Sequence, residues 1–529
     1  MRSTAAPRGG AHARRRRSGP VAVVVRTAPP RPPAPGRCDR PRAAGARRDR
    51  ADGVRRGPAP LGTPPGDLAQ AAAAALLAGA WTERAMLRRL QQAVRPLGPR
   101  LPARLVASVL ALHRTPPADA PRALAQEIDD LVRGHAPRGG WPPNARVRRR
   151  YAPPTAMRGA RWPVAPLPTV AALGRLVGER DPGALAWLAD VRGLEREVPD
   201  ERLRAYRYTH HPRTGGPPRV LERPKARLKE VQRTLLREVL APIPPHDAAC
   251  GFVAGRSVLD HAARHVGRTV VVQLDLEDFF AQVTAGRVFG ILRAAGYPEP
   301  VAHAIVGLTT NVVPYGFWAR IPRPDGPREI ERHHRLGRRL ATPHLPQGAP
   351  TSPALANLAA FRLDRRLDGL ARSLGLTYSR YADDLALSGG RHLARRAYEL
   401  ERTIAAIAAD EGFRVNPQKT RVRAREGRQT VCGIVVNERP AVARRDVDRL
   451  RALLHEAEVA GPRAADRGGM GPAFEAHVRG RVAWVAQVHP ARGARLREQL
   501  RRVDWSALRD TGDAGVHRSS PPGDRPFTS

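Results

Sequence analysis

The sequence predicts an α+β protein, because it carries helical and strand patterns in separate stretches. Apolar residues recur at helical spacing between about residues 67 and 134. Short apolar runs at 269–276, 376–381 and 385–388 are typical of buried strands. Two further strands with a basic turn between them are expected within 205–222. At 529 residues the chain is long enough for roughly two to four domains.

The charge balance predicts a partner with many phosphates. The formal net charge is +42, from 91 Lys and Arg against 49 Asp and Glu. Contacts between arginine and phosphate release counterions, so such a chain is expected to bind nucleic acid. The lysines are only Lys225, Lys229 and Lys419, and GC-rich coding explains arginine in their place but not the shortage of acids. Solubility or non-specific association is the alternative.

Cysteine content and hydropathy predict where in the cell the protein is found. Cys38, Cys250 and Cys432 are scattered without metal-ligand spacing, which argues against a disulfide framework and fits a reducing environment. No apolar run approaches the ~18 residues that span a bilayer, and 21–25 is too short for a signal peptide. We therefore expect a soluble, cytoplasmic protein without a membrane partner.

The ends of the chain differ in composition from its middle. Residues 1–65 are rich in Arg, Pro, Ala and Gly, and are expected to form a disordered basic tail. This tail is either an RNA-contacting arm or sequence upstream of the true start. A helical N-terminal domain is expected over 66–135, a Pro- and Arg-rich linker over 136–164, and a second disordered tail over 511–529.

Three aspartates stand where apolar strands end. Asp275 closes one strand, and Asp383 and Asp384 lie at the tip of a tight hairpin. A buried acid is costly unless it is paired or binds a cation. An isolated Asp-Asp pair would more often be a solvated turn, but the third aspartate and the apolar flanks favour a metal site. Two Mg²⁺ ions ~3.5–4 Å apart, held by oxygen ligands, catalyse phosphoryl transfer.

Several motifs in the correct order resemble those of reverse transcriptases. Tyr381-Ala382-Asp383-Asp384 resembles their Tyr-x-Asp-Asp box. The other matching segments are Cys250 to Ser257 (CGFVAGRS), Leu274 to Phe280 (LDLEDFF), Gln347 to Pro353 (QGAPTSP), Gly412 to Thr420, and Val431-Cys432-Gly433. The resemblance covers roughly residues 200–505. It implies an RNA-directed DNA polymerase.

The same resemblance implies a right-hand polymerase fold. The fingers are expected over 165–265, and the palm, with a ferredoxin-like antiparallel sheet, over 266–437. The palm includes an inserted finger segment and a basic loop at 320–339, which either follows RNA or is a solvated excursion. A helical thumb is expected over 438–510.

The resemblance also implies roles at the metal site. Asp275 and Asp383 become the direct ligands of two Mg²⁺ ions, with Mn²⁺ as a substitute. The carbonyl of Leu276 completes the site, and Asp384 is a companion acid. Phe280 takes the position of the steric gate, which selects deoxynucleotides because a flat ring leaves no room for the ribose hydroxyl. Core packing is the alternative reading of Phe280.

Further residues are expected to bind substrate. Gln347, Gly348 and Tyr381 would line the pocket for the incoming dNTP and template, where glycine lets the backbone approach closely. Arg219 is the candidate triphosphate clamp, because its guanidinium suits phosphate oxygens; the alternative is a solvated arginine. Lys419 is expected near the pyrophosphate leaving group, with a surface lysine as the alternative.

Within the family, the chain is most similar to retron-type enzymes. These use a structured non-coding RNA as template and primer, and make branched RNA–DNA in anti-phage defence. The resemblance implies that RNA, dNTPs, an RNA–DNA hybrid and an effector protein are partners. The chain has His261 and His265 where retron enzymes carry Asn-Ala-x-x-His, and Val431-Cys432-Gly433 where they carry Val-Thr-Gly. Both positions lie in regions linked to RNA recognition.

Three other functions remain open at this level. A group II intron-derived reverse transcriptase shares the palm motifs. A template-independent defence polymerase would use the same aspartates. A non-catalytic RNA-binding scaffold would have no need to keep three costly acids together, and an extension assay with and without Mg²⁺ separates it from the enzymes.

Overall fold

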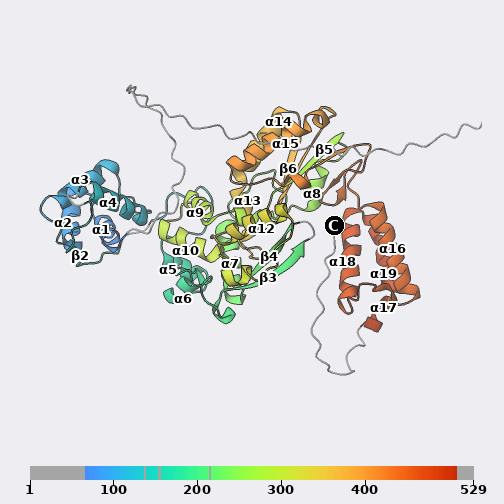
Figure 1. The fold of residues 1–529 in the computed structure, drawn as a ribbon, viewed down its shortest axis with the longest axis horizontal. Helices are drawn as coiled ribbons and strands as arrows, with labels where there is room; N and C mark the ends of the chain where they lie inside the picture. The colour runs from blue at the N-terminus through green and yellow to red at the C-terminus, as the bar shows by residue number, and fades with distance from the viewer. Residues whose placement is uncertain (1–65, 136–138, 153–155, 214–215, 509–529) are drawn as a thin grey trace, which may run out of the picture. The chain divides into compact units, whose positions relative to one another are not determined.

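The computed structural model describes residues 66–135, 139–152, 156–213 and 216–508 (Figure 1). The expected tails at 1–65 and 511–529 lie outside the described residues. In the described part of the chain, no helix combines the length and the apolar character needed to cross a bilayer.

Four helices form the N-terminal part, as the helical spacing predicts. They are α1 (Asp67–Leu77), α2 (Glu83–Ala93), α3 (Leu101–Leu112) and α4 (Pro121–His135). Their apolar faces meet in a separate core that includes Leu76, Leu90, Leu105 and Ile128. This core buries the stripes that a helix cannot shield by itself.

The segment expected as a linker is partly folded onto these helices. Strand β2 (Arg146–Val147) pairs with β1 (Val94–Arg95). The indole N–H of Trp141 donates to Asp129 Oδ1 at 2.7 Å. This part of 136–164 is therefore held by the helical core, because its few apolar side chains find partners there.

The next elements are two short helices, a long hairpin and the helices that follow it. They are α5 (Val170–Leu176), α6 (Pro182–Leu188), β3 (Tyr206–Arg213), β4 (Gly216–Pro224), α7 (Ala226–Leu235), the π-helical turn η2 (Leu236–Leu240) and α8 (Val258–Ala263). A short 3-10 turn η1 covers Glu201–Leu203. Side chains of Thr169, Asp181 and Ser257 accept N–H groups at the starts of α5, α6 and α8, which is why these helices begin there.

An antiparallel sheet of four strands is formed by elements that lie far apart in the sequence. Its strands are β5 (Val270–Asp275), β6 (Thr377–Tyr381), β7 (Asp384–Gly389) and β8 (Arg421–Ala424), in the order β6-β7-β5-β8. Both faces of the central strands β5 and β7 are buried, which explains why these strands appear in the sequence as continuous apolar runs.

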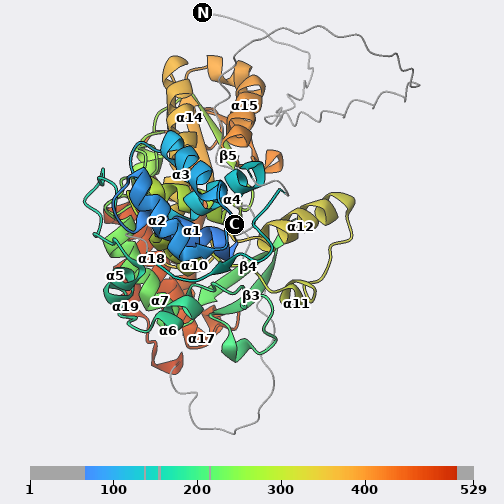
Figure 2. The ribbon, with the colours of Figure 1, turned by 90° about the vertical axis from the view of Figure 1, so that its left-hand side faces the viewer.

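Helices α14 (Phe361–Ser373) and α15 (His392–Asp410) pack against strands of this sheet. Helices α9 (Ala285–Ala294), α10 (Glu299–Thr309) and α13 (Ser352–Ala359) contribute to the same core, with 3-10 turns η3 (Phe280–Gln282) and η4 (Pro417–Lys419) nearby. Val272, Leu274 and Leu385 face this main core. Helices α14 and α15 lie side by side in both views (Figures 1 and 2). Val271 and Ala386 face a smaller cluster with Ala262 of α8 and Val431.

The prediction of a basic loop at 320–339 is wrong. The stretch after α11 (Tyr315–Trp318) leads into α12 (Pro327–Leu340), which packs beside β4 (Figure 2). His333, Leu336 and Leu340 recur at helical spacing and are buried, so the arginines between them occupy a helix. Arg335 and Arg339 of α12 form ion pairs with Glu277 and Asp278, just after Asp275.

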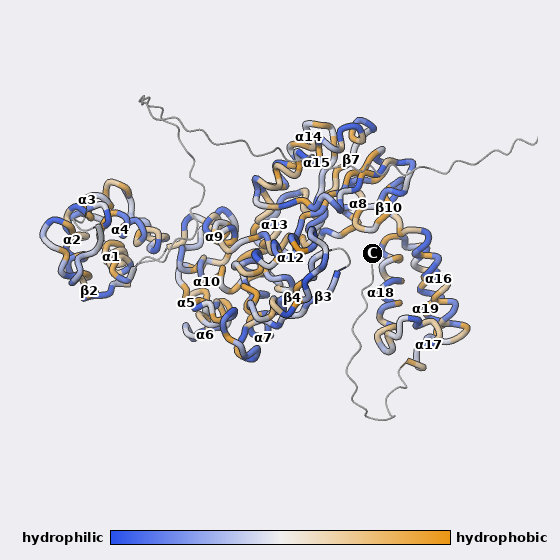
Figure 3. Tube along the Cα trace, viewed as in Figure 1, coloured by the Kyte–Doolittle hydropathy of each residue, from blue (hydrophilic) through white to orange (hydrophobic). Residues whose placement is uncertain are grey.

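The C-terminal part is helical. It comprises β9 (Thr430–Val431), β10 (Ile434–Val435), α16 (Arg444–Val459), α17 (Pro462–Ala465), α18 (Ala473–Val488), α19 (Pro490–Arg502) and the turn η5 (Ser506–Leu508). Hydrophilic and hydrophobic stretches alternate along α16 and α19 (Figure 3). Their apolar sides share a core with α18 that includes Leu450, Val482 and Leu496.

Candidate active site

The structure brings the three predicted aspartates together. Asp275, at the end of β5, pairs in register with Asp384, the first residue of β7. The N–H of Leu276 donates to the carbonyl of Asp383 at 2.9 Å. Ala382 takes a left-handed conformation, φ +55°, which makes the tight turn between β6 and β7. The strand pairing therefore places Asp383 and Asp384 beside Asp275, although more than 100 residues separate them in sequence.

The electrostatics of this carboxylate cluster favour a cation. Burial and the charges of Asp383 and Asp275 raise the pKa of Asp384 to about 6. Burial, followed by the charge of Asp275, also raises the pKa of Asp383. Lys419 Nζ lies 2.8 Å from Asp275 Oδ2. Three crowded carboxylates beside this lysine are destabilised unless further positive charge joins them.

The donor set fits Mg²⁺ or Mn²⁺, which prefer carboxylate, carbonyl and phosphate oxygens. Asp384 is partly engaged elsewhere, because the thiol of Cys432 lies 3.4 Å from its Oδ2. Among the described residues, no three His, Cys, Asp or Glu side chains are arranged to hold a metal by themselves. Asp275 and Asp383 would thus hold the ion together with the Leu276 carbonyl and oxygens from the substrate.

Phe280 lies directly after the Asp275 segment, in η3. Its half-buried ring packs against the main core and contacts Phe279 at a centroid distance of 5.7 Å. It also contacts the exposed ring of Phe252 at 6.2 Å. The ring is therefore partly in the core and partly accessible.

The Gln347-Gly348 loop lies against the β3–β4 hairpin. The N–H of Glu222 donates to the carbonyl of Gln347 at 2.8 Å. Gly348 has φ +124°, and a Cβ there would lie 3.1 Å from the carbonyl oxygen of Glu222. Only glycine fits this close approach without strain. Arg219, on the same hairpin, is exposed opposite His211, so its guanidinium is available to an anion.

A buried polar network, which the sequence did not reveal, ties this hairpin to the loop. Glu222 accepts hydrogen bonds from His344 Nε2 at 2.9 Å and Asn311 Nδ2 at 2.8 Å. Burial lowers the pKa of His344, but the charge and hydrogen bond of Glu222 outweigh it, so the net pKa is raised. Asn311 also donates to the hydroxyl of Tyr208. The network fixes β4 next to Gln347.

The sequence predicts that His261 and His265 take part in RNA recognition. Both side chains are fully buried, so they do not contact RNA directly. His265 makes hydrogen bonds to Ser388 at 2.8 Å and Ser379 at 2.7 Å, and His261 bonds to Ser379 at 2.8 Å. Burial lowers the pKa of His261 to about 4 and of His265 to about 3. The pair fastens α8 to strands β6 and β7.

The Val431-Cys432-Gly433 segment also lies against the sheet. Val431 is fully buried in the cluster with Val271 and Ala386. Cys432, φ +46°, and the exposed Gly433, φ +79°, form the turn between β9 and β10. The segment contacts the carboxylate cluster through Cys432, a contact that no sequence pattern signals.

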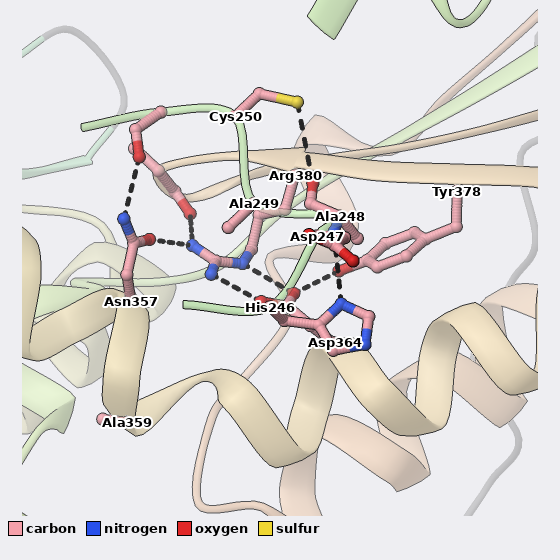
Figure 4. Close-up of polar contacts among 12 residues, drawn as sticks. His246, Asp247, Ala248, Ala249, Cys250, Asn357, Ala359, Asp364, Tyr378 and Arg380 are labelled. Atoms are coloured by element: carbon pink, nitrogen blue, oxygen red, sulfur yellow. Dashed lines mark hydrogen bonds and ion pairs between the residues drawn. The ribbon is translucent and has the colours of Figure 1, made fainter. Parts of the chain in front are cut away.

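A buried arginine supports the turn between β6 and β7 (Figure 4). Arg380 on β6 binds both carboxylate oxygens of Asp364, at 2.8 and 2.7 Å. Its remaining nitrogen donates to Asn357 Oδ1 and to the carbonyl of Ala382, both at 3.0 Å. Asn357 in turn donates to the carbonyl of Gly251 at 2.8 Å. The only sequence signal was a basic residue inside an otherwise uncharged strand.

The Cys250–Ser257 segment lies next to this turn. The N–H of Cys250 donates to the carbonyl of Arg380 at 2.7 Å. A Cβ on Gly251 would lie 2.6 Å from the amide nitrogen of Ala382. The motif therefore packs against the β6–β7 hairpin, and glycine at position 251 permits the close contact.

Comparison with known proteins agrees with this geometry. Residues 212–436 match the family model described as "Reverse transcriptase (RNA-dependent DNA polymerase)". The chain is 43% identical over 305 residues to the retron Mx65 reverse transcriptase of Myxococcus xanthus, covering 56% of this chain and 65% of that protein. It is 38% identical over 312 residues to the retron Mx162 reverse transcriptase of the same organism, covering 56% of this chain and 60% of the relative.

A third relative is more distant. The retron Ec86 reverse transcriptase of Escherichia coli is 29% identical over 276 residues, covering 51% of this chain and 72% of that protein. The chain thus spans less than two thirds of the length of the two Myxococcus relatives. The resemblance to retron-type reverse transcriptases, which the motifs predict, is confirmed.

Proposed function

We propose that this protein is an RNA-directed DNA polymerase that copies a structured non-coding RNA into DNA. The observation that carries the proposal is the meeting of Asp275, Asp383 and Asp384 at the edge of the central sheet. The reverse transcriptase domain over 212–436 and the retron relatives support the same activity.

The residues at this site divide the work of nucleotidyl transfer. Asp275 and Asp383 would hold two Mg²⁺ ions, which lower the pKa of the primer hydroxyl and neutralise charge on the transferred phosphate. Lys419, whose Nζ lies 2.8 Å from Asp275 Oδ2, would bind the oxygens of the pyrophosphate leaving group. Asp384, one of whose carboxylate oxygens contacts the thiol of Cys432, would add negative charge next to Asp275 and Asp383.

The fingers hairpin and the loop beside it would bind the nucleotide. Arg219 projects from β4 as the triphosphate clamp, with a guanidinium fork suited to phosphate oxygens. Gln347 and Gly348 are held against the same strand and would contact the base pair. Phe280 and Tyr381 would lie under the sugar and the primer end, where Phe280 excludes ribonucleotides.

The RNA partner follows from the resemblance to retron enzymes. We propose that the RNA provides both template and primer, that the product is branched RNA–DNA, and that the system acts in anti-phage defence with an effector protein. The excess of 91 basic over 49 acidic side chains suits an extended contact with RNA phosphates.

The test is primer extension on an RNA template with the full chain. We expect dNTP incorporation that depends on Mg²⁺ or Mn²⁺ and follows the template sequence. Asp383→Asn and Asp275→Asn should each reduce the rate by at least about 10³-fold while RNA affinity stays the same. Asp410→Asn, at an exposed ion pair on α15, is the matched control and should retain full activity.

Three results would contradict the proposal in different ways. Full polymerisation by Asp383→Asn would exclude the metal mechanism. Product sequences unrelated to the template would indicate a template-independent polymerase. Tight RNA binding without incorporation under any metal would indicate a scaffold. Sequencing of nucleic acid that co-purifies with the protein tests the retron assignment, which predicts a branched RNA–DNA molecule.

A further inference from the structure

Three aromatic rings form a continuous row beside the carboxylate cluster. Phe252 lies 6.2 Å from Phe280 and 6.3 Å from Tyr381, measured between ring centroids. Phe280 follows the strand of Asp275, and Tyr381 precedes Asp383 by two residues. Phe252 comes from a third segment, the Cys250–Ser257 motif, and connects the other two rings.

Phe252 has two features that core packing does not explain. Its side chain is 49% exposed, so it does not fill the interior. Its backbone is left-handed, φ +60°, a conformation that is costly for any residue with a side chain and that recurs at functional sites. An exposed phenylalanine on a strained backbone stabilises the fold little. The function of Phe252 is therefore expected in the contacts of its ring.

The surrounding contacts hold Phe252 in this conformation. Gly251 is pressed against the Ala382 amide, with its carbonyl bound by Asn357. After Phe252 the chain turns back, and Arg256 donates to the carbonyls of Asp247 at 2.8 Å and Ala249 at 2.6 Å. One end of the loop is thus fixed to the β6–β7 turn and the other to residues 247–249 of the preceding segment, which leaves the ring little freedom.

We propose that Phe252 is a positioning residue that sets the sugar specificity of the polymerase by holding the ring of Phe280. The inference rests on the proposed function, in which Phe280 selects deoxynucleotides. A steric gate excludes a hydroxyl only if its ring cannot move aside, because a small displacement opens enough space for one oxygen atom. Phe280 has two ring neighbours: Phe279, which is buried in the core, and Phe252, which supports its accessible part.

The row also explains the contact with Tyr381. A ring between the sugar gate and the end of β6 keeps the space for the nucleotide sugar continuous with the space for the primer end. Loss of the Phe252 ring would leave Phe280 and Tyr381 without the ring between them. The added space would improve the binding of a ribonucleotide more than that of a deoxynucleotide, which already fits.

The experiment measures the ratio of kcat/KM for a dNTP to that for the matching rNTP, with the full chain on an RNA template. Phe252→Gly is the main variant, because glycine adopts φ +60° without strain and removes only the ring. We expect the ratio to fall by about tenfold or more, through a gain in rNTP use, while kcat for dNTP changes by less than about threefold. Phe252→Tyr keeps the ring and should restore the wild-type ratio.

Three further variants serve as controls and comparisons. Phe361→Ala removes another partly exposed phenylalanine, 38% exposed and 5.4 Å from the ring of His246, and should leave the ratio unchanged. Phe280→Ala should abolish discrimination. Phe252→Leu is a milder variant that serves as the test if Phe252→Gly does not fold. It should shift the ratio in the same direction by a smaller factor.

The outcomes separate this inference from the proposed function. An unchanged ratio in Phe252→Gly with a lost ratio in Phe280→Ala would overturn the role of Phe252 and leave the gate intact. Unchanged ratios in both variants would show that Phe280 is not the gate. Equal losses of dNTP and rNTP use in Phe252→Gly would also overturn it, because they would indicate a general structural role.

Discussion

Arg380 and Asp364 form a two-point ion pair inside the protein, with nitrogen–oxygen distances of 2.8 and 2.7 Å and no solvent exposure of either side chain. Tyr378 donates to the same carboxylate at 2.8 Å, and Arg380 also binds the carbonyl of Ala382. The pair joins helix α14 to strand β6, and Arg380 fixes the turn between β6 and β7 through the Ala382 carbonyl.

Removal of one partner of this pair should be costly, because the other charge stays buried without compensation. We expect Arg380→Met or Asp364→Leu to reduce the free energy of unfolding by about 3–5 kcal/mol. The double variant should lose clearly less than the sum of the two, which urea unfolding can measure. Additive losses would show that the pair is not coupled. Arg396→Met, at an exposed pair with Glu399, is the control and should cost under about 1 kcal/mol.

Gly251→Ala should disturb the catalytic turn directly. The added methyl would lie 2.6 Å from the Ala382 amide nitrogen, a backbone atom that cannot rotate away. We expect a loss of about 1–3 kcal/mol in stability and a fall in kcat for dNTP incorporation. Gly290→Ala is the matched control, since a Cβ there meets nothing within 4 Å, and alanine favours its helix. Equal activity in the two variants would contradict the close contact.

Protonation of His265 should weaken the fold as the pH falls. Burial and, after it, the charge of His261 lower its pKa from 6.5 to about 3, so the folded protein keeps the ring neutral. Below pH 6.5 the unfolded chain therefore binds a proton that the folded chain does not. Stability should drop between pH 6.5 and 3 by up to about 1.4 kcal/mol per pH unit from this group.

The measurement is the free energy of unfolding at several pH values in wild type and His265→Gln. The variant lacks the titrating ring, so its stability should fall less steeply below pH 6.5, although it is less stable at pH 7.5 through altered bonds to Ser379 and Ser388. Identical slopes would rule out a neutral buried His265.

Glu222→Gln should act on nucleotide binding. The change keeps the shape of the side chain but removes the charge that pairs with His344, so the attachment of β4 to the Gln347 loop loosens. We expect KM for dNTP to rise by about tenfold with a smaller effect on kcat. The control is Glu230→Gln, at an exposed pair on α7. A change in kcat alone would indicate that the network does not reach the nucleotide pocket.

Much of the architecture is visible in local patterns. The helices of the N-terminal part, the β3–β4 hairpin and strands β5, β6 and β7 all follow from periodicity and turn residues. The 320–339 stretch does not show its helix in the sequence, because many arginines surround the buried stripe of three residues. The sequence also does not show that His261 and His265 are buried, because a histidine can face solvent or, as here, serines on neighbouring strands.

By itself, the sequence determined the identity of the acids and the order of the motifs around them, because strand periodicity and turn chemistry are local properties. Only the tertiary structure decided which groups support those acids: Arg380 beneath the turn, Cys432 beside Asp384, Glu222 against the Gln347 loop, and Phe252 against Phe280. These partners come from strands, helices and loops far apart in the chain. Their contacts depend on packing, which no local pattern encodes.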